Sequence, residues 1–177
     1  MNLPNKLSIA RALCIPVIVI LLYLNDEGCR IAAAVLFILA ALTDLLDGKI
    51  ARKYNLVTDF GKFIDPVADK LLVLTTLVML VRGGLMEAWV TVVILCRELA
   101  VDGLRMVAVT KGKVIAAGPL GKWKTACQMV LISVMLFLNL GVFQAWPVTV
   151  LAGVVVVLTL VSGVDYFVRN ASVLSLK

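Results

Sequence analysis

The chain has 177 residues, of which 62% are hydrophobic and 16% are charged, and its mean hydropathy is +1.07. Soluble domains are about 45–50% apolar and about 25% charged, so this composition excludes an ordinary water-soluble globule, a disordered chain and a nucleic-acid-binding module. In a chain this apolar, the formal charge of +6 indicates lysines and arginines gathered in cytoplasmic loops rather than a surface for nucleic acid.

Six apolar runs follow one another along the chain, and each is close to the length of about 20 residues that a membrane-spanning helix requires. The runs cover residues 3–24, 31–48, 63–82, 86–109, 123–140 and 146–168. Inside a bilayer every backbone amide needs a hydrogen-bond partner within its own segment, so runs of this length predict helices. We therefore expect an all-α integral membrane protein, with six transmembrane helices in one membrane-embedded domain over residues 1–177.

The first run also has the form of a signal peptide, because Lys6 and Arg11 stand near the start of an apolar stretch. It ends in the polar residues 25–28 without a clear small-x-small cleavage site, which favours a retained first helix.

The distribution of charge between the loops predicts the orientation of the six helices. Most lysines and arginines lie on the side that both termini share, for example in segments 49–53, 111–113 and 122–124. The opposite side holds Arg30 and Arg82 beside acidic residues. Because positively charged loops remain in the cytoplasm, we expect both termini there, in a multi-pass protein of the cell membrane.

Four aspartates lie close together around the second and third runs: Asp44, Asp47, Asp65 and Asp69. The first two are three residues apart and the last two are four apart, and both spacings place a pair on one helix face. The segment between the two runs is short, so we expect all four carboxylates to converge near the inner membrane surface. Acidic groups at membrane depth are costly and therefore indicate function.

Four ionised carboxylates in one place require positive charge to neutralise them. Ion pairs with neighbouring basic residues are one way: Arg52, Lys53, Lys62 and Lys70. The other way is binding of divalent cations, of which two are expected. The ligands are hard oxygens and the chain has no histidine, so Mg²⁺, Mn²⁺ or Ca²⁺ is expected rather than Zn²⁺. A pair of carboxylate-bound metal ions is suited to phosphoryl transfer.

Residues between the aspartates also suit a phosphorylated ligand. Gly48 leaves the backbone beside Asp47 open to a ligand. The planar guanidinium of Arg52 matches a diphosphate. Gly61 precedes the third run, where the first amides of a helix favour an anion, although a glycine there equally suits a turn.

The sequence resembles the CDP-alcohol phosphatidyltransferase family in a motif with eight fixed positions, all of which match. The motif reads Asp44-Leu-Leu-Asp47-Gly48-Lys-Ile-Ala51-Arg52, then eight residues, Gly61, three residues, Asp65, three residues and Asp69. The opening Pro4-Asn5 and Arg11 are also similar to the start of that family. The resemblance extends over essentially the whole chain and includes its six-helix layout.

The resemblance implies a reaction at the inner membrane surface, in which CDP-diacylglycerol donates its phosphatidyl group to an alcohol and CMP leaves. It implies that Asp44, Asp47 and Asp65 hold two Mg²⁺ or Mn²⁺ ions. It further implies that Asp69 binds metal and is the catalytic general base toward the acceptor hydroxyl. The family commonly forms homodimers, so the resemblance implies a homodimer among membrane lipids here.

The resemblance also assigns residues to the CDP-lipid. Gly48 and Arg52 match positions that contact the diphosphate and nucleotide of CDP-diacylglycerol. Three further residues are expected to help seat the nucleotide: Asn5, Thr58 and Gly61.

The second half of the chain holds a separate set of charged residues: Arg97, Glu98, Asp102, Arg105, Lys122 and Lys124. Helical spacing turns Glu98 toward Asp102 and Arg105, so mutual ion pairs are one interpretation. The two lysines alternatively anchor the fifth helix at the membrane surface. An acceptor bearing its own phosphate, however, requires a cationic pocket, which a neutral acceptor such as inositol does not.

Two patterns are similar to the branch of the family that uses sn-glycerol 3-phosphate and yields phosphatidylglycerol phosphate: Arg97-Glu98-x5-Leu104-Arg105 and Gly121-Lys122-x-Lys124-Thr125. This resemblance implies that the acceptor phosphate is bound by Arg97, Arg105, Lys122 and Lys124. Branches that use inositol phosphate, phosphatidylglycerol or serine remain open. A small divalent-cation transporter is the alternative from another class, and a structural membrane adaptor would leave the spacing of the aspartates unexplained.

Overall fold

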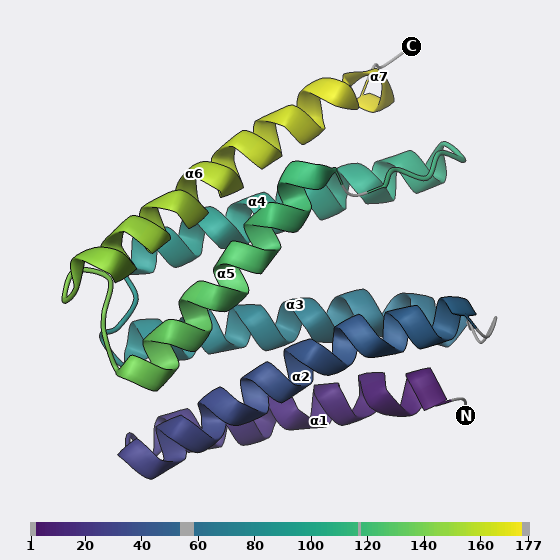
Figure 1. Ribbon diagram of the computed structural model, residues 1–177. Helices are drawn as coiled ribbons and strands as arrows, with labels where there is room; N and C mark the ends of the chain where they lie inside the picture. The colour runs from purple at the N-terminus through teal and green to yellow at the C-terminus, as the bar shows by residue number, and fades with distance from the viewer. Residues whose placement is uncertain (1–2, 54–58, 117, 175–177) are drawn as a thin grey trace. The chain divides into compact units, whose positions relative to one another are not determined.

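The computed structural model describes residues 3–53, 59–116 and 118–174, with side chains for residues 7–43, 64–116 and 118–173. Every regular element in these ranges is a helix, which confirms the all-α prediction (Figure 1). The helices are α1 (Leu3–Tyr23), α2 (Glu27–Lys53), α3 (Asp59–Arg82), α4 (Ala88–Thr110), α5 (Pro119–Leu138), α6 (Trp146–Arg169) and α7 (Ala171–Leu174).

Two helices begin before the apolar runs that predicted them, because the residues at their starts favour a first helical turn. Helix α2 begins at Glu27, before the apolar run expected from residue 31, and the Asp26 Oδ2 accepts a 3.2 Å hydrogen bond from the Cys29 amide. Helix α5 begins at Pro119, where a missing amide proton does no harm in the first turn. Composition alone does not detect such polar extensions.

The described chain divides into two compact units, and each is considered by itself. Unit one comprises Met1–Met86 with Ile132–Leu140. In it α1 packs against both α2 and α3 (Figure 1). Its fully buried apolar side chains include Ile18 of α1, Phe37 of α2 and Leu72 of α3.

The end of α5 that belongs to unit one is capped by an arginine from α2. The Arg30 Nη1 donates a hydrogen bond to the Leu136 carbonyl and another, at 3.1 Å, to the Phe137 carbonyl. The last carbonyls of a helix lack partners within the helix, so a guanidinium placed there satisfies them. Arg30, expected only as a charge on the outer side, is therefore a helix cap.

Unit two comprises Glu87–Leu131 with Gly141–Lys177. Helix α4 packs against α6, and α7 packs against the end of α4. Their shared core contains Val101, Leu104 and Ala108 of α4 with Tyr166 of α6 and Val173 of α7.

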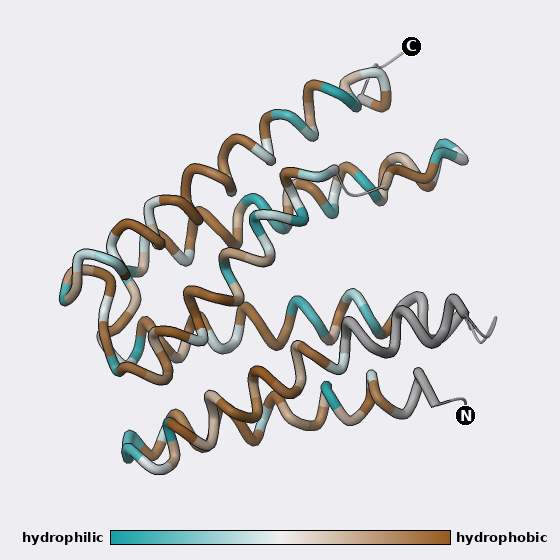
Figure 2. The backbone as a smooth tube through the Cα atoms, viewed as in Figure 1, coloured by the Kyte–Doolittle hydropathy of each residue, from teal (hydrophilic) through white to brown (hydrophobic). Residues whose placement is uncertain are grey.

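Helix α6 has an apolar surface and a partly polar buried face. Val150, Val157 and Val164 are each more than half exposed, whereas Thr159 and Ser162 are buried. Figure 2 shows the apolar character of α6 along most of its length. Among the described residues, α6 is the one helix that is both long and apolar enough to cross a membrane, with a mean hydropathy of 2.3. Six spans remain a prediction.

Candidate functional site

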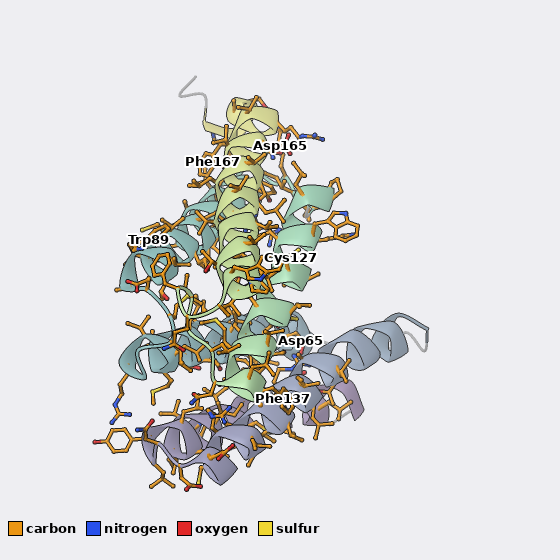
Figure 3. The ribbon with its side chains drawn as sticks, turned by 60° about the vertical axis from the view of Figure 1, so that its left-hand side comes forward. Asp65, Trp89, Cys127, Phe137, Asp165 and Phe167 are labelled. Carbon is orange, nitrogen blue, oxygen red and sulfur yellow. The ribbon has the colours of Figure 1, made fainter. Side chains whose placement is uncertain are left out.

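Two of the four predicted metal-binding aspartates lie on α3 in unit one. Asp65 and Asp69 are one helical turn apart, and both are partly buried. Asp65 is labelled in Figure 3. Its Oδ1 accepts a hydrogen bond from the Ser8 Oγ of α1, and Ser8 is completely buried. The contact between α1 and α3 therefore sets the orientation of the Asp65 carboxylate.

A buried arginine joins α1 to the helix that contains Asp44. Arg11 is 1% exposed, and its Nε donates a 3.3 Å hydrogen bond to the Ala40 carbonyl of α2. Ala40 precedes Asp44 by one turn of the same helix. The Arg11 side chain is thus fixed where α1 meets the aspartate-bearing part of α2.

Sequence reasoning missed Ser8, and it noted Arg11 only as a charge near the start of the first apolar run and as part of the family-like opening. Asn5, Ser8 and Arg11 are spaced by three residues, which places them on one face of α1. That periodicity was the available signal. Ser8 and Arg11, whose side chains are described, are both buried in an otherwise apolar helix.

Much of the predicted donor site lies outside the described side chains. This holds for Asn5, Asp44, Asp47, Gly48, Arg52 and Gly61, and Thr58 lies outside the described backbone as well. Within the described side chains, no group of three or more histidine, cysteine, aspartate or glutamate residues is placed to hold a metal ion. Asp65 and Asp69 supply hard oxygen atoms from one helix face, which fits Mg²⁺ or Mn²⁺ and not a soft metal.

Unit two brings three charged side chains from α4 and α5 to one point. The Glu98 Oε1 lies 3.1 Å from the Arg97 Nη1 and 2.5 Å from the Lys124 Nζ. The side chains of Arg97 and Glu98 are each 14% exposed, and that of Lys124 is 3% exposed. Two of the four predicted phosphate-binding residues, Arg97 and Lys124, are therefore neighbours that both contact the Glu98 carboxylate.

The other two predicted phosphate-binding residues lie apart from this pair. Arg105 is eight residues, or about 12 Å, beyond Arg97 on α4. Its Nε donates a 2.9 Å hydrogen bond to the Tyr166 hydroxyl of α6, and the guanidinium lies 5.5 Å from the centre of that ring. Lys122 is exposed at the start of α5.

Glu98 has a partner that helical spacing does not suggest. Spacing turns Glu98 toward Asp102 and Arg105 on its own helix, yet its Oε1 contacts Lys124, which is 26 residues away on α5. The fold brings the Lys124 ammonium group of α5 to this carboxylate of α4. In a buried environment this charge pair outweighs an exposed pair along one helix.

The comparisons with known proteins agree on one family. The family profile of CDP-alcohol phosphatidyltransferase matches residues 1–164. A CDP-diacylglycerol–glycerol-3-phosphate 3-phosphatidyltransferase of Bacillus subtilis (strain 168) is 46% identical over 183 aligned residues, covering 96% of this chain and 95% of the relative.

More distant relatives have similar names. A protein of Rickettsia bellii with the same name as the Bacillus relative is 40% identical, covering 94% of this chain and 93% of its own. A probable phosphatidylglycerophosphate synthase of Mycobacterium tuberculosis is 39% identical, covering 95% of this chain and 81% of its own.

Proposed function

The chain belongs to the CDP-alcohol phosphatidyltransferase family, and from this membership we propose that it transfers the phosphatidyl group of CDP-diacylglycerol to sn-glycerol 3-phosphate. The products are phosphatidylglycerol phosphate and CMP. The observation that supports this most directly is the near-complete overlap with relatives named for this reaction. The side chains of unit two support the choice of acceptor.

The buried charges of unit two suit a phosphorylated acceptor. Arg97 and Lys124 together contribute two positive charges, and Glu98 contributes one negative charge. A net positive charge away from water is stabilised by an anion, because the low local dielectric strengthens the attraction. We propose that the phosphate of glycerol 3-phosphate is this anion, with Arg105 and Lys122 as additional phosphate contacts.

The donor half of the proposed site is the aspartate motif. We propose that Asp44, Asp47, Asp65 and Asp69 hold two divalent ions, Mg²⁺ or Mn²⁺. When bound, such ions neutralise the diphosphate and stabilise the charge that develops on the departing CMP. The CDP part of the lipid is assigned to Arg52 and Gly48, with Asn5, Thr58 and Gly61 at the nucleotide.

The proposed transfer forms a bond between the acceptor oxygen and the phosphatidyl phosphorus, and it breaks the bond from that phosphorus to CMP. The attacking hydroxyl must lose its proton as the new bond forms. We assign this proton to the Asp69 carboxylate, which lies one turn from Asp65 on α3. Phosphoryl transfer depends mainly on positioning and charge stabilisation, and both follow from residues held on rigid helices.

A CDP-lipid substrate requires an enzyme embedded in the bilayer, and the exposed apolar side chains of α6 are consistent with contact to lipid. We propose a multi-pass arrangement of six spans in the cell membrane, with both termini and the active site facing the cytoplasm. We also propose that the protein is a homodimer, as the family resemblance implies.

An acceptor panel tests the proposed function. Purified protein with CDP-diacylglycerol and Mg²⁺ is offered glycerol 3-phosphate, inositol phosphate, inositol, serine and phosphatidylglycerol, and CMP release is measured. We expect CMP with glycerol 3-phosphate only. Faster release with another acceptor would assign the protein to a different branch. No release with any acceptor, together with metal uptake into sealed vesicles, would indicate a transporter.

Removing single cations should weaken binding of the acceptor. We expect Arg105→Ala and Lys124→Ala each to raise the acceptor KM by about tenfold or more, because each removes a charged hydrogen bond to phosphate. The KM for CDP-diacylglycerol should stay unchanged. Lys113→Ala, which removes an exposed lysine between α4 and α5, is the control. An unchanged acceptor KM in both variants would contradict the pocket assignment.

A further inference from the structure

Glu98 is the residue that joins the two buried cations of unit two. One oxygen, Oε1, is within 3.1 Å of the Arg97 Nη1 and within 2.5 Å of the Lys124 Nζ. Without the carboxylate, an arginine of α4 and a lysine of α5 would face each other as like charges in a buried place. Such charges repel more strongly than on the surface, so Glu98 keeps the guanidinium and the ammonium group together.

The far side of the Arg97 guanidinium is held by α6. Its Nη2 donates a 3.2 Å hydrogen bond to the Ser162 Oγ, and this hydroxyl donates in turn to the Thr159 carbonyl at 3.2 Å. The Arg97 Nε is buried and has no hydrogen-bond partner among the described residues. A buried N–H group without a partner is unusual, and this one can donate a hydrogen bond to an anionic ligand.

Two glycines leave the space that the Arg97 side chain occupies. A Cβ added at Gly163 of α6 would lie 3.2 Å from the Arg97 Cγ, and one added at Gly121 of α5 would lie 3.4 Å from the Arg97 Nη2. The side chain is held at its tip by Glu98 and Ser162, so it has little freedom to move aside. The path of the Arg97 stem thus depends on the absence of a side chain at Gly163, whereas Gly121 is in ordinary contact range of the guanidinium.

We infer that Glu98 is a positioning residue for the acceptor: it holds Arg97 and Lys124 on one carboxylate oxygen, while Ser162 and Gly163 fix the other side of the guanidinium, so that both cations meet one phosphate group. This inference rests on the proposed function. It adds three residues from two helices to the acceptor site: Glu98, Ser162 and Gly163. Glu98 belongs to the Arg97-Glu98-x5-Leu104-Arg105 pattern, whereas Ser162 and Gly163 belong to neither the family motif nor the two branch patterns. Their role is exerted through the cations and not on the substrate directly.

Positioning and charge neutralisation predict opposite effects for Glu98→Gln. Glutamine keeps the shape of the side chain and loses its charge, so the charge of the three-residue cluster rises from +1 to +2. If Glu98 only reduced the positive charge, the variant would bind phosphate more tightly and its acceptor KM would fall. If Glu98 positions the cations, they separate by repulsion and the acceptor KM rises.

The experiment compares steady-state kinetics of wild type and Glu98→Gln, with glycerol 3-phosphate and CDP-diacylglycerol varied in turn. We expect the acceptor KM to rise by about tenfold and the KM for CDP-diacylglycerol to stay the same. A general loss of structure would lower the active fraction and reduce the apparent kcat without changing either KM. An acceptor KM that falls or stays equal to the wild-type value would overturn the inference.

A pair of glycine variants keeps the inference testable if Glu98→Gln does not fold. Gly163→Ala places a methyl group against the Arg97 stem, whereas Gly153→Ala, on the same helix, meets nothing within 4 Å. We expect a several-fold rise in the acceptor KM for Gly163→Ala and none for Gly153→Ala. Equal acceptor KM values in the two variants would contradict the role of Gly163 in holding Arg97.

Failure of this inference is distinguishable from failure of the proposed function. A wild-type enzyme that releases no CMP with glycerol 3-phosphate refutes the proposed acceptor, and the same variants are then compared with the phosphorylated acceptor that the panel identifies. A wild-type enzyme that is active with glycerol 3-phosphate, beside variants with unaltered acceptor KM, refutes the positioning role alone.

Discussion

Replacing Asp69 by asparagine is expected to lower kcat by about 10²–10⁴-fold, the range that a general base contributes. Asparagine has the same shape as aspartate, and its amide oxygen remains a metal ligand, but it does not accept the proton of the attacking hydroxyl. Metal and CDP-diacylglycerol should therefore still bind. The measurement is CMP release at saturating concentrations of both substrates, with binding of the CDP-lipid determined separately.

Asp26→Asn is the matched control for this substitution. Asp26 also lies in unit one, where its carboxylate accepts a hydrogen bond from the Cys29 amide at the start of α2. Asparagine is as good a residue at a helix N-terminus, so stability and turnover should stay at the wild-type level. Normal turnover by Asp69→Asn would remove the assignment of Asp69 as the general base.

Removing divalent cations is expected to reduce activity to the background rate, and Mg²⁺ or Mn²⁺ should restore it. The physical reason is the charge of the proposed donor site, where four aspartates would face the negatively charged diphosphate of the CDP-lipid. Without cations the carboxylates repel this diphosphate, and the departing CMP has no positive charge to stabilise it.

The measurement is CMP release in excess chelator, followed by titration with each metal. A sample in which chelator is saturated with Mg²⁺ from the start controls for direct inhibition by the chelator. Zn²⁺ is expected to be a poor replacement, because the proposed ligands are carboxylates and the chain has no histidine. Activity that persists in excess chelator would count against the proposed metal site.

The helices of this protein follow directly from its sequence. A helix is formed by hydrogen bonds between residues four positions apart, so the apolar runs were sufficient to predict it. The arrangement of two motif residues could be predicted for the same reason, because the helix alone places Asp65 and Asp69 on one face. The six spans stay a prediction, because α6 is the one described helix that is long and apolar enough to cross a membrane, and α4 contains charged residues such as Arg97 and Glu98.

Partners of the polar side chains were decided by tertiary structure. Ser8 and Asp65 are 57 residues apart, and Arg97 and Ser162 are 65 apart, so no periodicity within a helix relates them. Helical spacing offered Glu98 two neighbours on α4, but a buried ammonium group on α5 stabilises its carboxylate as well. The stability of a buried charge depends on the opposite charge beside it. Packing in the folded chain decides which opposite charge that is. The sequence by itself thus determined the helices and the chemical kinds of residue available for catalysis, whereas only the fold decided which of them act together.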